Sequence, residues 1–98
     1  MQFILRFYDR PERLALRQQY LNQHLAWLAA RQNTILAAGS LRPDADAAAS
    51  GAVWIVEAES FAAASQVWQS DPFWIHGLRE QHVEVMSWNR SVPDKVLI

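Results

Sequence analysis

Residues 2–32 have the sequence QFILRFYDRPERLALRQQYLNQHLAWLAARQ, in which a strand pattern is followed by a helix pattern. Over residues 2–8 every second side chain is a large apolar one, which is typical of a half-buried β-strand. Asp9 and Pro11 break this alternation, and both residue types suit the first turn of a helix. Leucines then recur at helical spacing. The segment therefore predicts a strand at 2–8 and a helix at 11–32.

The same order of elements returns in the rest of the chain. Ser60 is a good N-cap for a second helix, and the Asp71-Pro72 step ends that helix because a residue before proline resists helical conformation. We expect strands at 34–41, 52–58 and 80–88, a second helix at 61–69 and a short helical turn at 72–76. This order predicts an α+β fold, a ferredoxin-like βαββαβ sandwich with a four-stranded antiparallel sheet and both helices on one face.

The sheet face opposite the helices is predicted to be apolar. The residues assigned to it are Ile4, Trp54, Val56, Met86 and Trp88. Such a face is too apolar for water, so we expect a homodimer in which a second copy of the chain covers it. The alternative is a one-residue error in the assumed alternation of a strand, which would turn its side chains to the other face. The tail at 91–98 ends in three apolar residues and is a further candidate for contact with the partner.

Composition limits the classes of function. With 98 residues, 51% hydrophobic and 19% charged, the chain is expected to form one globular domain over residues 1–98. The formal net charge of -1 and the lack of an RNP pattern argue against a nucleic-acid partner. Without cysteine, disulfides and thiolate chemistry are excluded. No signal-peptide pattern and no apolar run of about 18 residues is present, so we expect a cytoplasmic protein with no membrane partner.

His24 is the candidate acid–base residue. On a helical wheel it lies beside the leucine stripe, on the inner flank of the helix, and Arg17 lies two turns earlier on the same flank. A partly desolvated imidazole can be tuned to exchange protons near neutral pH. A histidine in this place can equally fill the edge of the core with one satisfied hydrogen bond. The spacing alone leaves both interpretations open.

Asp71 and the Gly39-Ser40 pair are the other candidates. Asp71 either caps the turn that begins at Pro72 or orients the imidazole of His24, and the local sequence fits both. Gly39-Ser40 lies at a predicted strand end, where backbone N–H groups and a hydroxyl can meet a substrate. The histidines are not spaced as metal ligands and the glycines form no phosphate-binding motif, so we expect no metal and no cofactor.

These segments together resemble the YciI-like (YCII-related) family of small dimeric α+β-barrel proteins. The most specific element is the step Asp71-Pro72-Phe73 followed by Gly77-Leu78. The other matching pieces, in order, are Gln23-His24-Leu25, Ala38-Gly39-Ser40-Leu41 and the strand VWIVEA at 53–58. The resemblance covers nearly the whole chain. It implies a ferredoxin-like subunit that dimerises sheet to sheet as a dimeric α+β barrel, and a pocket in which a histidine and an aspartate, here His24 and Asp71, form an acid–base pair.

The resemblance leaves two classes of function open. In the first, the chain is a cofactor-independent enzyme of lyase (dehydrochlorinase-like) or isomerase type. His24 would move a proton beside the carbonyl or lactone group of a small acid, while Asp71 orients its imidazole. Arg17 would anchor a substrate carboxylate, and Ser40 with the backbone near Gly39 would hold an oxyanion. In the second, the same pocket only binds a small acidic ligand, or the dimer is an accessory module.

Overall fold

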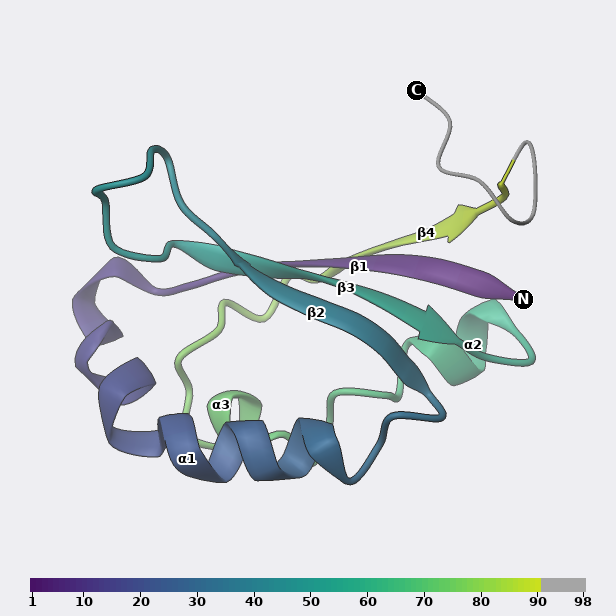
Figure 1. Cartoon of the computed structure of the whole chain (residues 1–98), viewed down its shortest axis with the longest axis horizontal. Coiled ribbons are helices and arrows are strands. Elements are labelled where there is room, and N and C mark those ends of the chain that lie inside the picture. The colour runs from purple at the N-terminus through teal and green to yellow at the C-terminus, as the bar shows by residue number, and fades with distance from the viewer. Residues whose placement is uncertain (91–98) are drawn as a thin grey trace.

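The computed structural model describes residues 1–90 and contains four strands and four helical elements (Figure 1). The strands are β1 (Gln2–Tyr8), β2 (Ile35–Leu41), β3 (Gly51–Glu57) and β4 (Glu84–Trp88). The helical elements are the 3-10 helix η1 (Pro11–Arg13), the helix α1 (Ala15–Ala29) and the single turns α2 (Phe61–Ala64) and α3 (Pro72–Ile75). The tail at 91–98, a candidate for contact with a partner, lies outside the described residues.

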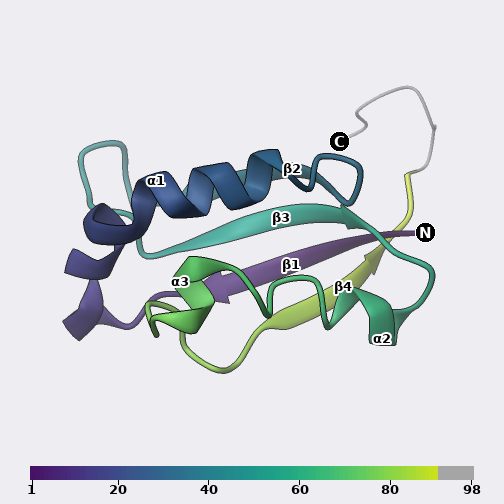
Figure 2. The same cartoon turned by 90° about the horizontal axis from the view of Figure 1, so that it is seen from below.

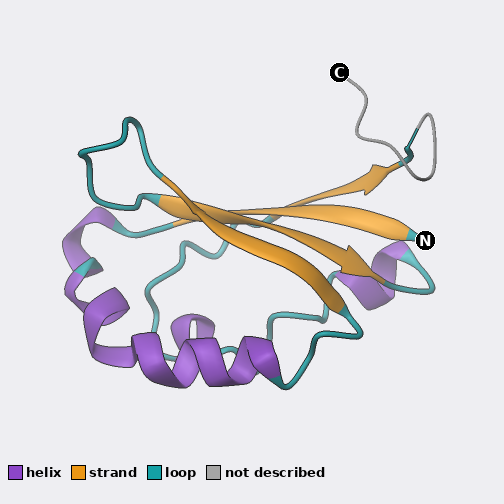
Figure 3. Cartoon of the chain, viewed as in Figure 1, coloured by secondary structure: helices purple, strands orange, loops and turns teal. Residues whose placement is uncertain are grey.

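The strands form one antiparallel sheet in the order β2-β3-β1-β4. The helical elements of residues 1–90 all lie on one face of it, as the purple and orange layers of Figure 3 show. From below, α1 runs along β2 and β3, while α2 and α3 lie on the side of β1 and β4 (Figure 2). This arrangement confirms the predicted α+β, ferredoxin-like βαββαβ sandwich.

The predicted helix at 11–32 is too long. It begins with η1, continues as α1 and ends at Ala29, and turns occupy residues 30–34. In these turns the backbone N–H of Ile35 donates to the carbonyl of Arg31 at 2.8 Å, which directs the chain into β2. Helical spacing of apolar residues does not show where a chain must reverse toward its sheet.

Two other elements are also shorter than predicted. The helix expected at 61–69 is α-helical only for the four residues of α2, after which the chain continues in turns that carry Trp68 into the core. The strand expected at 80–88 begins only at Glu84. The turn predicted at 72–76 is present as α3.

The assignment of Trp54 and Val56 to the open sheet face is wrong. Their side chains are 1% and 0% exposed, and they face the helices. The register explains this: Trp54 pairs with Leu5 and Val56 with Phe3, and directly paired residues of an antiparallel sheet share a face. The alternation predicted for β3 is present, but the prediction assigned its two sets of side chains to the wrong faces of the sheet.

The open face nevertheless has an apolar part, in which Ile4, Met86 and Trp88 lie as predicted, while Arg6 and Glu84 lie on the same face. Ile4 pairs with both Ile55 and Met86, which places these three side chains in one row across the sheet. Val53 of β3 and Trp88 of β4 lie on the same face. Met86 is 46% exposed, and no described helix covers the row.

The core lies between the sheet and the helices and is built largely from aromatic rings. Phe7 contacts the rings of Trp54 and Trp68 at centroid distances of 4.5 and 5.7 Å. On α1 the buried residues are His24 and Trp27, whereas Leu25 in the predicted leucine stripe is 50% exposed. Leu28 still packs against the core, but the fully buried contacts of α1 are made by His24 and Trp27 and not by the leucines.

Candidate active site

His24 and Asp71 are brought together by α1 and α3. Nδ1 of His24 lies 2.7 Å from Oδ1 of Asp71, and the two residues are only 6% and 1% exposed. An ionised carboxylate can only accept hydrogen bonds, so the proton of a neutral imidazole is held on Nδ1 in this pair. Nε2 is then the ring nitrogen that can accept a proton.

Asp71 also caps α3. The same Oδ1 accepts a hydrogen bond from the backbone N–H of Phe73 at 3.0 Å, and Pro72 occupies the first helical position. The predicted cap is therefore confirmed, and the same carboxylate also lies within hydrogen-bond distance of His24. Because the cap fixes the carboxylate to the backbone, the position of the imidazole is fixed with it.

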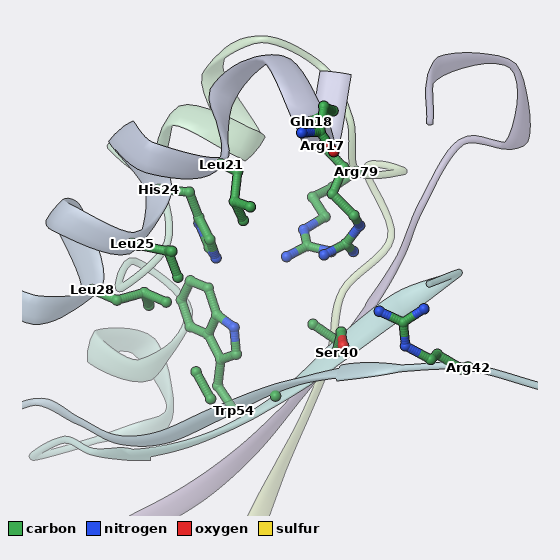
Figure 4. A pocket seen from close by; sticks show the side chains of 13 residues that line it. Arg17, Gln18, Leu21, His24, Leu25, Leu28, Ser40, Arg42, Trp54 and Arg79 are labelled. Carbon is green, nitrogen blue, oxygen red and sulfur yellow. The ribbon is translucent and has the colours of Figure 1, made fainter. Parts of the chain in front are cut away.

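The imidazole of His24 is also held from its face. It is stacked on the ring of Phe73, with centroids 3.9 Å apart and an interplanar angle of 11°. The ring of Trp54 lies 6.4 Å away, from the sheet side. With Asp71 at one edge and Phe73 on one face, the free edge of the ring points into a cavity, as Figure 4 shows.

The cavity lies between α1 and the strands β2 and β3 and has a volume of about 330 Å³. It is partly open to solvent, and it is at the small end of the range for ligand pockets. Its polar lining comes from Arg17, Ser40, Arg42 and Arg79, and its apolar lining includes Leu21, Leu25, Leu28 and Trp54. Arg17, Gly39, Ser40 and His24, four of the predicted site residues, line it, and Asp71 lies behind His24.

A second buried polar cluster adjoins the cavity, and sequence reasoning missed most of it. Oδ2 of Asp9 accepts from Nη2 of Arg17 at 2.5 Å, and Oδ1 accepts from Nη1 of Arg79 at 2.6 Å. Asp9 was expected to cap the first helix, but its side chain is turned inward and η1 has no side-chain cap. Because Asp9 and Arg79 are 70 positions apart, no local pattern connects them.

Arg79 is placed by the turn that follows α3. Gly77 has φ +82, a conformation that glycine adopts without strain, and it turns the chain so that Arg79 forms a β-bridge with Asp9. Arg79 is 3% exposed. Burial lowers the pKa of the Arg79 guanidinium, and the charge of Arg17 lowers it further, while the carboxylate of Asp9 raises it.

No metal-ligand cluster is found within residues 1–90: no three His, Asp or Glu side chains come together in a way that could bind an ion. In the same part of the chain, no helix has the length and apolar character needed to cross a membrane. The groups that the described residues bring to the cavity are the imidazole of His24 with a carboxylate behind it, the hydroxyl of Ser40 and three guanidinium groups.

Comparison with solved structures finds relatives of the same fold. The 5-chloro-2-hydroxyhydroquinone dehydrochlorinase TftG from Burkholderia phenoliruptrix AC1100, in complex with 2,5-dihydroxybenzoquinone, is 27% identical with a TM-score of 0.80, over 93% of this chain and 96% of that chain. A mutant of SnoaB, a cofactor-independent oxygenase from Streptomyces nogalater, is 16% identical with a TM-score of 0.54, over 95% and 96%. The oxygenase shows the fold alone.

Two further comparisons concern the sequence. A search of curated proteins finds no match. The family model described as the YCII-related domain matches residues 1–89, so the match includes every element of the sheet and both His24 and Asp71. The resemblance noted in the sequence is thereby confirmed, and the chain belongs to the YCII-related domain family.

Proposed function

We propose that this chain is a cofactor-independent enzyme of lyase or isomerase type, which moves a proton on a small acid that contains a carbonyl or lactone group. The observation that carries the proposal is the orientation of His24. Its Nδ1 is bonded to the buried carboxylate of Asp71 at 2.7 Å, while its free edge faces a cavity of about 330 Å³ lined with arginines. An oriented imidazole with one free nitrogen is suited to general base catalysis.

The proposed reaction begins when Nε2 of His24 takes a proton from a carbon beside the substrate carbonyl. The C–H electron pair moves into the new carbon–carbon double bond, and the carbonyl oxygen becomes an enolate. In this proposal Asp71 stabilises the imidazolium that forms, and Ser40 with the backbone near Gly39, which both line the cavity, stabilises the enolate oxygen. In a lyase reaction a leaving group then departs with its electron pair; in an isomerase reaction His24 returns the proton to another carbon.

Similarity to TftG favours the lyase form of this proposal. That protein is named a dehydrochlorinase, an enzyme that removes hydrogen chloride, and the alignment covers nearly the full length of both chains. In a dehydrochlorination the proton goes to the base and chloride leaves with the electron pair. His24 and Asp71 can supply the base, and the arginines of the cavity favour an anionic substrate.

Chloride release from chlorinated lactone acids that carry a hydrogen beside the carbonyl tests the proposed step. Chloride release from 5-chloro-2-hydroxyhydroquinone, from which the base must take a hydroxyl proton instead, tests the wider dehydrochlorinase form of the proposal. The assay is run without oxygen because hydroquinones oxidise in air. The wild-type chain is expected to release chloride faster than buffer, and His24→Gln is expected to lose this activity. His82→Gln is the matched control, since His82 is exposed and does not line the cavity. Equal rates for the two variants would contradict the role of His24.

The burial of His24 favours one alternative, a non-catalytic protein that binds a small acidic ligand. His24 is 6% exposed, and a sealed pair can be structural. The alternative predicts that small acids bind and that no tested substrate is turned over. Proton exchange at carbon distinguishes the two: an enzyme transfers solvent deuterium into a bound ketoacid, and a binding module does not.

We also propose that the working unit is a homodimer of single-domain chains, each spanning residues 1–98. Supporting this, Ile4, Ile55 and Met86 form an uncovered apolar row across the sheet. Such a row exposed to water is typical of an interaction site. A second copy would meet it with the same row, as in a two-fold symmetric interface.

A further inference from the structure

The carboxylate of Asp9 holds two guanidinium groups side by side at one end of the cavity. Each of its oxygens accepts from a different arginine, Oδ2 from Arg17 at 2.5 Å and Oδ1 from Arg79 at 2.6 Å. A carboxylate that satisfies one arginine fully would use both oxygens for it, in two parallel bonds. Here the carboxylate is divided between two arginines, so each guanidinium keeps N–H donors that Asp9 does not use.

Some of these remaining donors are buried without a partner. Nε of Arg17 and Nε of Arg79 are both inaccessible to solvent, and neither donates a hydrogen bond to any acceptor within residues 1–90. The side chain of Arg79 is 1% exposed and that of Arg17 is 21% exposed. Buried donors are almost always hydrogen-bonded in folded proteins. The two guanidinium groups are therefore not fully satisfied within residues 1–90, and both line the cavity, which favours a ligand with acceptor atoms there.

The charge of the cluster indicates the sign of that ligand. Two cations share the single negative charge of Asp9, and a third arginine, Arg42, also lines the cavity. The carboxylate of Asp71 is already bonded to His24. An excess of positive charge in a partly buried place is costly unless an anion compensates it. The ligand is therefore expected to be an anion.

The apolar side of the cavity indicates what the part of the ligand away from its anionic group is like. Figure 4 shows the guanidinium groups of Arg17 and Arg79 together on one side, and Leu25, Leu28 and Trp54 on the other. A molecule whose anionic group reaches the arginines would lay an apolar or aromatic part against these side chains. The free edge of the His24 ring points into the space between the two ends.

We infer that Arg79 and Arg17 together bind the carboxylate of a small, flat organic acid, and that Asp9 is a positioning residue that holds the two guanidinium groups in place. The inference extends the sequence-based expectation that Arg17 anchors a substrate carboxylate, and it rests on the proposed function only for the reaction that follows binding. It assigns a ligand-binding role to Arg79, which no feature of the local sequence indicates.

Benzoate and benzamide provide the test, because they have nearly the same shape and only benzoate carries a charge. Calorimetry on the wild-type chain at low ionic strength is expected to show benzoate binding at least about tenfold more tightly than benzamide, the effect of one charge-assisted hydrogen bond. Equal affinity for the two, or no binding of benzoate, would overturn the inference.

NMR locates the binding without any substitution in the measured protein. The Nε–H signals of Arg17 and Arg79 are expected to shift when benzoate is added, and the Nε–H signal of the exposed Arg13 is expected to stay in place. Arg17→Lys and Arg79→Lys serve to assign the signals. Benzoate shifts confined to other residues would show that the anion binds elsewhere and would overturn the inference.

Arg79→Lys tests the need for the guanidinium itself. Lysine keeps the positive charge but lacks the planar fork, so benzoate affinity is expected to fall about tenfold while benzamide affinity is unchanged. Arg13→Lys is the matched control, with both affinities as in the wild type. Unchanged benzoate affinity in Arg79→Lys would contradict the role of Arg79. If Arg79→Lys does not fold, the inference is tested by the calorimetry and the NMR shifts of the wild-type chain.

Benzoate binding and substrate turnover, both measured on the wild-type chain, separate this inference from the proposed function. The binding site is located by the Nε–H signals of Arg17 and Arg79, and the turnover is measured by chloride release. Benzoate binding through Arg17 and Arg79 without turnover of any substrate leaves the inference standing and contradicts the enzyme. Turnover of a substrate by a protein that binds benzoate and benzamide equally supports the proposed enzyme and contradicts the inference.

Discussion

One oxygen of Asp71 accepts both from Nδ1 of His24, 47 positions away, and from the backbone N–H of Phe73, two residues on. The short-range bond begins α3, and the long-range bond fixes the imidazole. An imidazole held this way keeps one orientation and one tautomer. This arrangement makes the proposed contribution of Asp71 to catalysis separable from its contribution to folding.

Asp71→Asn is expected to lower the rate of the proposed reaction by about 10²–10⁴-fold, because an amide does not hold the proton on Nδ1 or stabilise the imidazolium. Asparagine is as good an N-cap as aspartate, so the thermal midpoint should change little. Chloride release and thermal unfolding measure the two effects. Asp46→Asn, in an exposed loop, is the control. A full-rate Asp71→Asn protein would refute the pairing as a catalytic device.

The Nδ1–H proton of His24 should be visible by NMR as a strongly downfield signal that exchanges slowly with water. Its partner is a carboxylate 2.7 Å away in a site almost closed to solvent. In Asp71→Asn the signal should move upfield or disappear. If the wild-type spectrum instead shows the proton on Nε2, the tautomer assigned to His24 is wrong.

Ile55→Glu is expected to convert the proposed dimer to a monomer, since it places a charge in the middle of the apolar row with Ile4 and Met86. Gel filtration with light scattering measures the mass. Ile75→Glu is the matched control, because Ile75 lies on α3 and is 61% exposed on the opposite side of the sheet. A wild-type chain that is monomeric at working concentration would contradict the dimer.

Tyr8 gives a prediction for alkaline pH. Its hydroxyl donates to the carboxylate of Glu84, and this hydrogen bond raises the pKa of Tyr8 above its ordinary value of 10.0. A raised pKa means that the folded chain holds the proton more tightly than the unfolded chain. The stabilisation is complete below pH 10.0 and is lost as pH rises through the raised value.

Glu84→Ala should therefore lower the pH at which Tyr8 ionises and reduce the loss of stability at alkaline pH. Tyrosinate absorbance measures the ionisation, in a Tyr20→Phe background that leaves Tyr8 as the single tyrosine of the chain. An unchanged Tyr8 titration in Glu84→Ala would show that the hydrogen bond does not persist in solution.

Gly51→Ala is expected to reduce the free energy of unfolding by about 3 kcal/mol or more, because the new Cβ would lie 2.2 Å from the carbonyl oxygen of Phe7, a backbone atom that cannot move aside. Gly39→Ala is the matched control in the same sheet, since a Cβ there meets nothing within 4 Å. Urea unfolding compares the two. Similar losses for both would show that the close approach of β1 and β3 is not maintained.

The sequence by itself determined the order of strands and helices, because alternation and helical spacing are local properties of the chain. It also identified His24 and Asp71 as candidates, since each is marked locally: His24 lies beside an apolar stripe, and Asp71 precedes a proline. Their contact was not determined by spacing: it was one of two interpretations that the local sequence of Asp71 left open, and the resemblance to a family favoured it.

Only the tertiary structure decided which face of β3 meets the helices. Alternation is symmetric, so it separates two sets of side chains without saying which set is inside; the pairing of Trp54 with Leu5 settles that question. Asp9 and Arg79 are a case of the same kind. The buried carboxylate of Asp9 requires a partner of opposite charge. Arg79 becomes that partner only when the turn after α3 is packed against the end of β1, and this packing is a property of the tertiary structure.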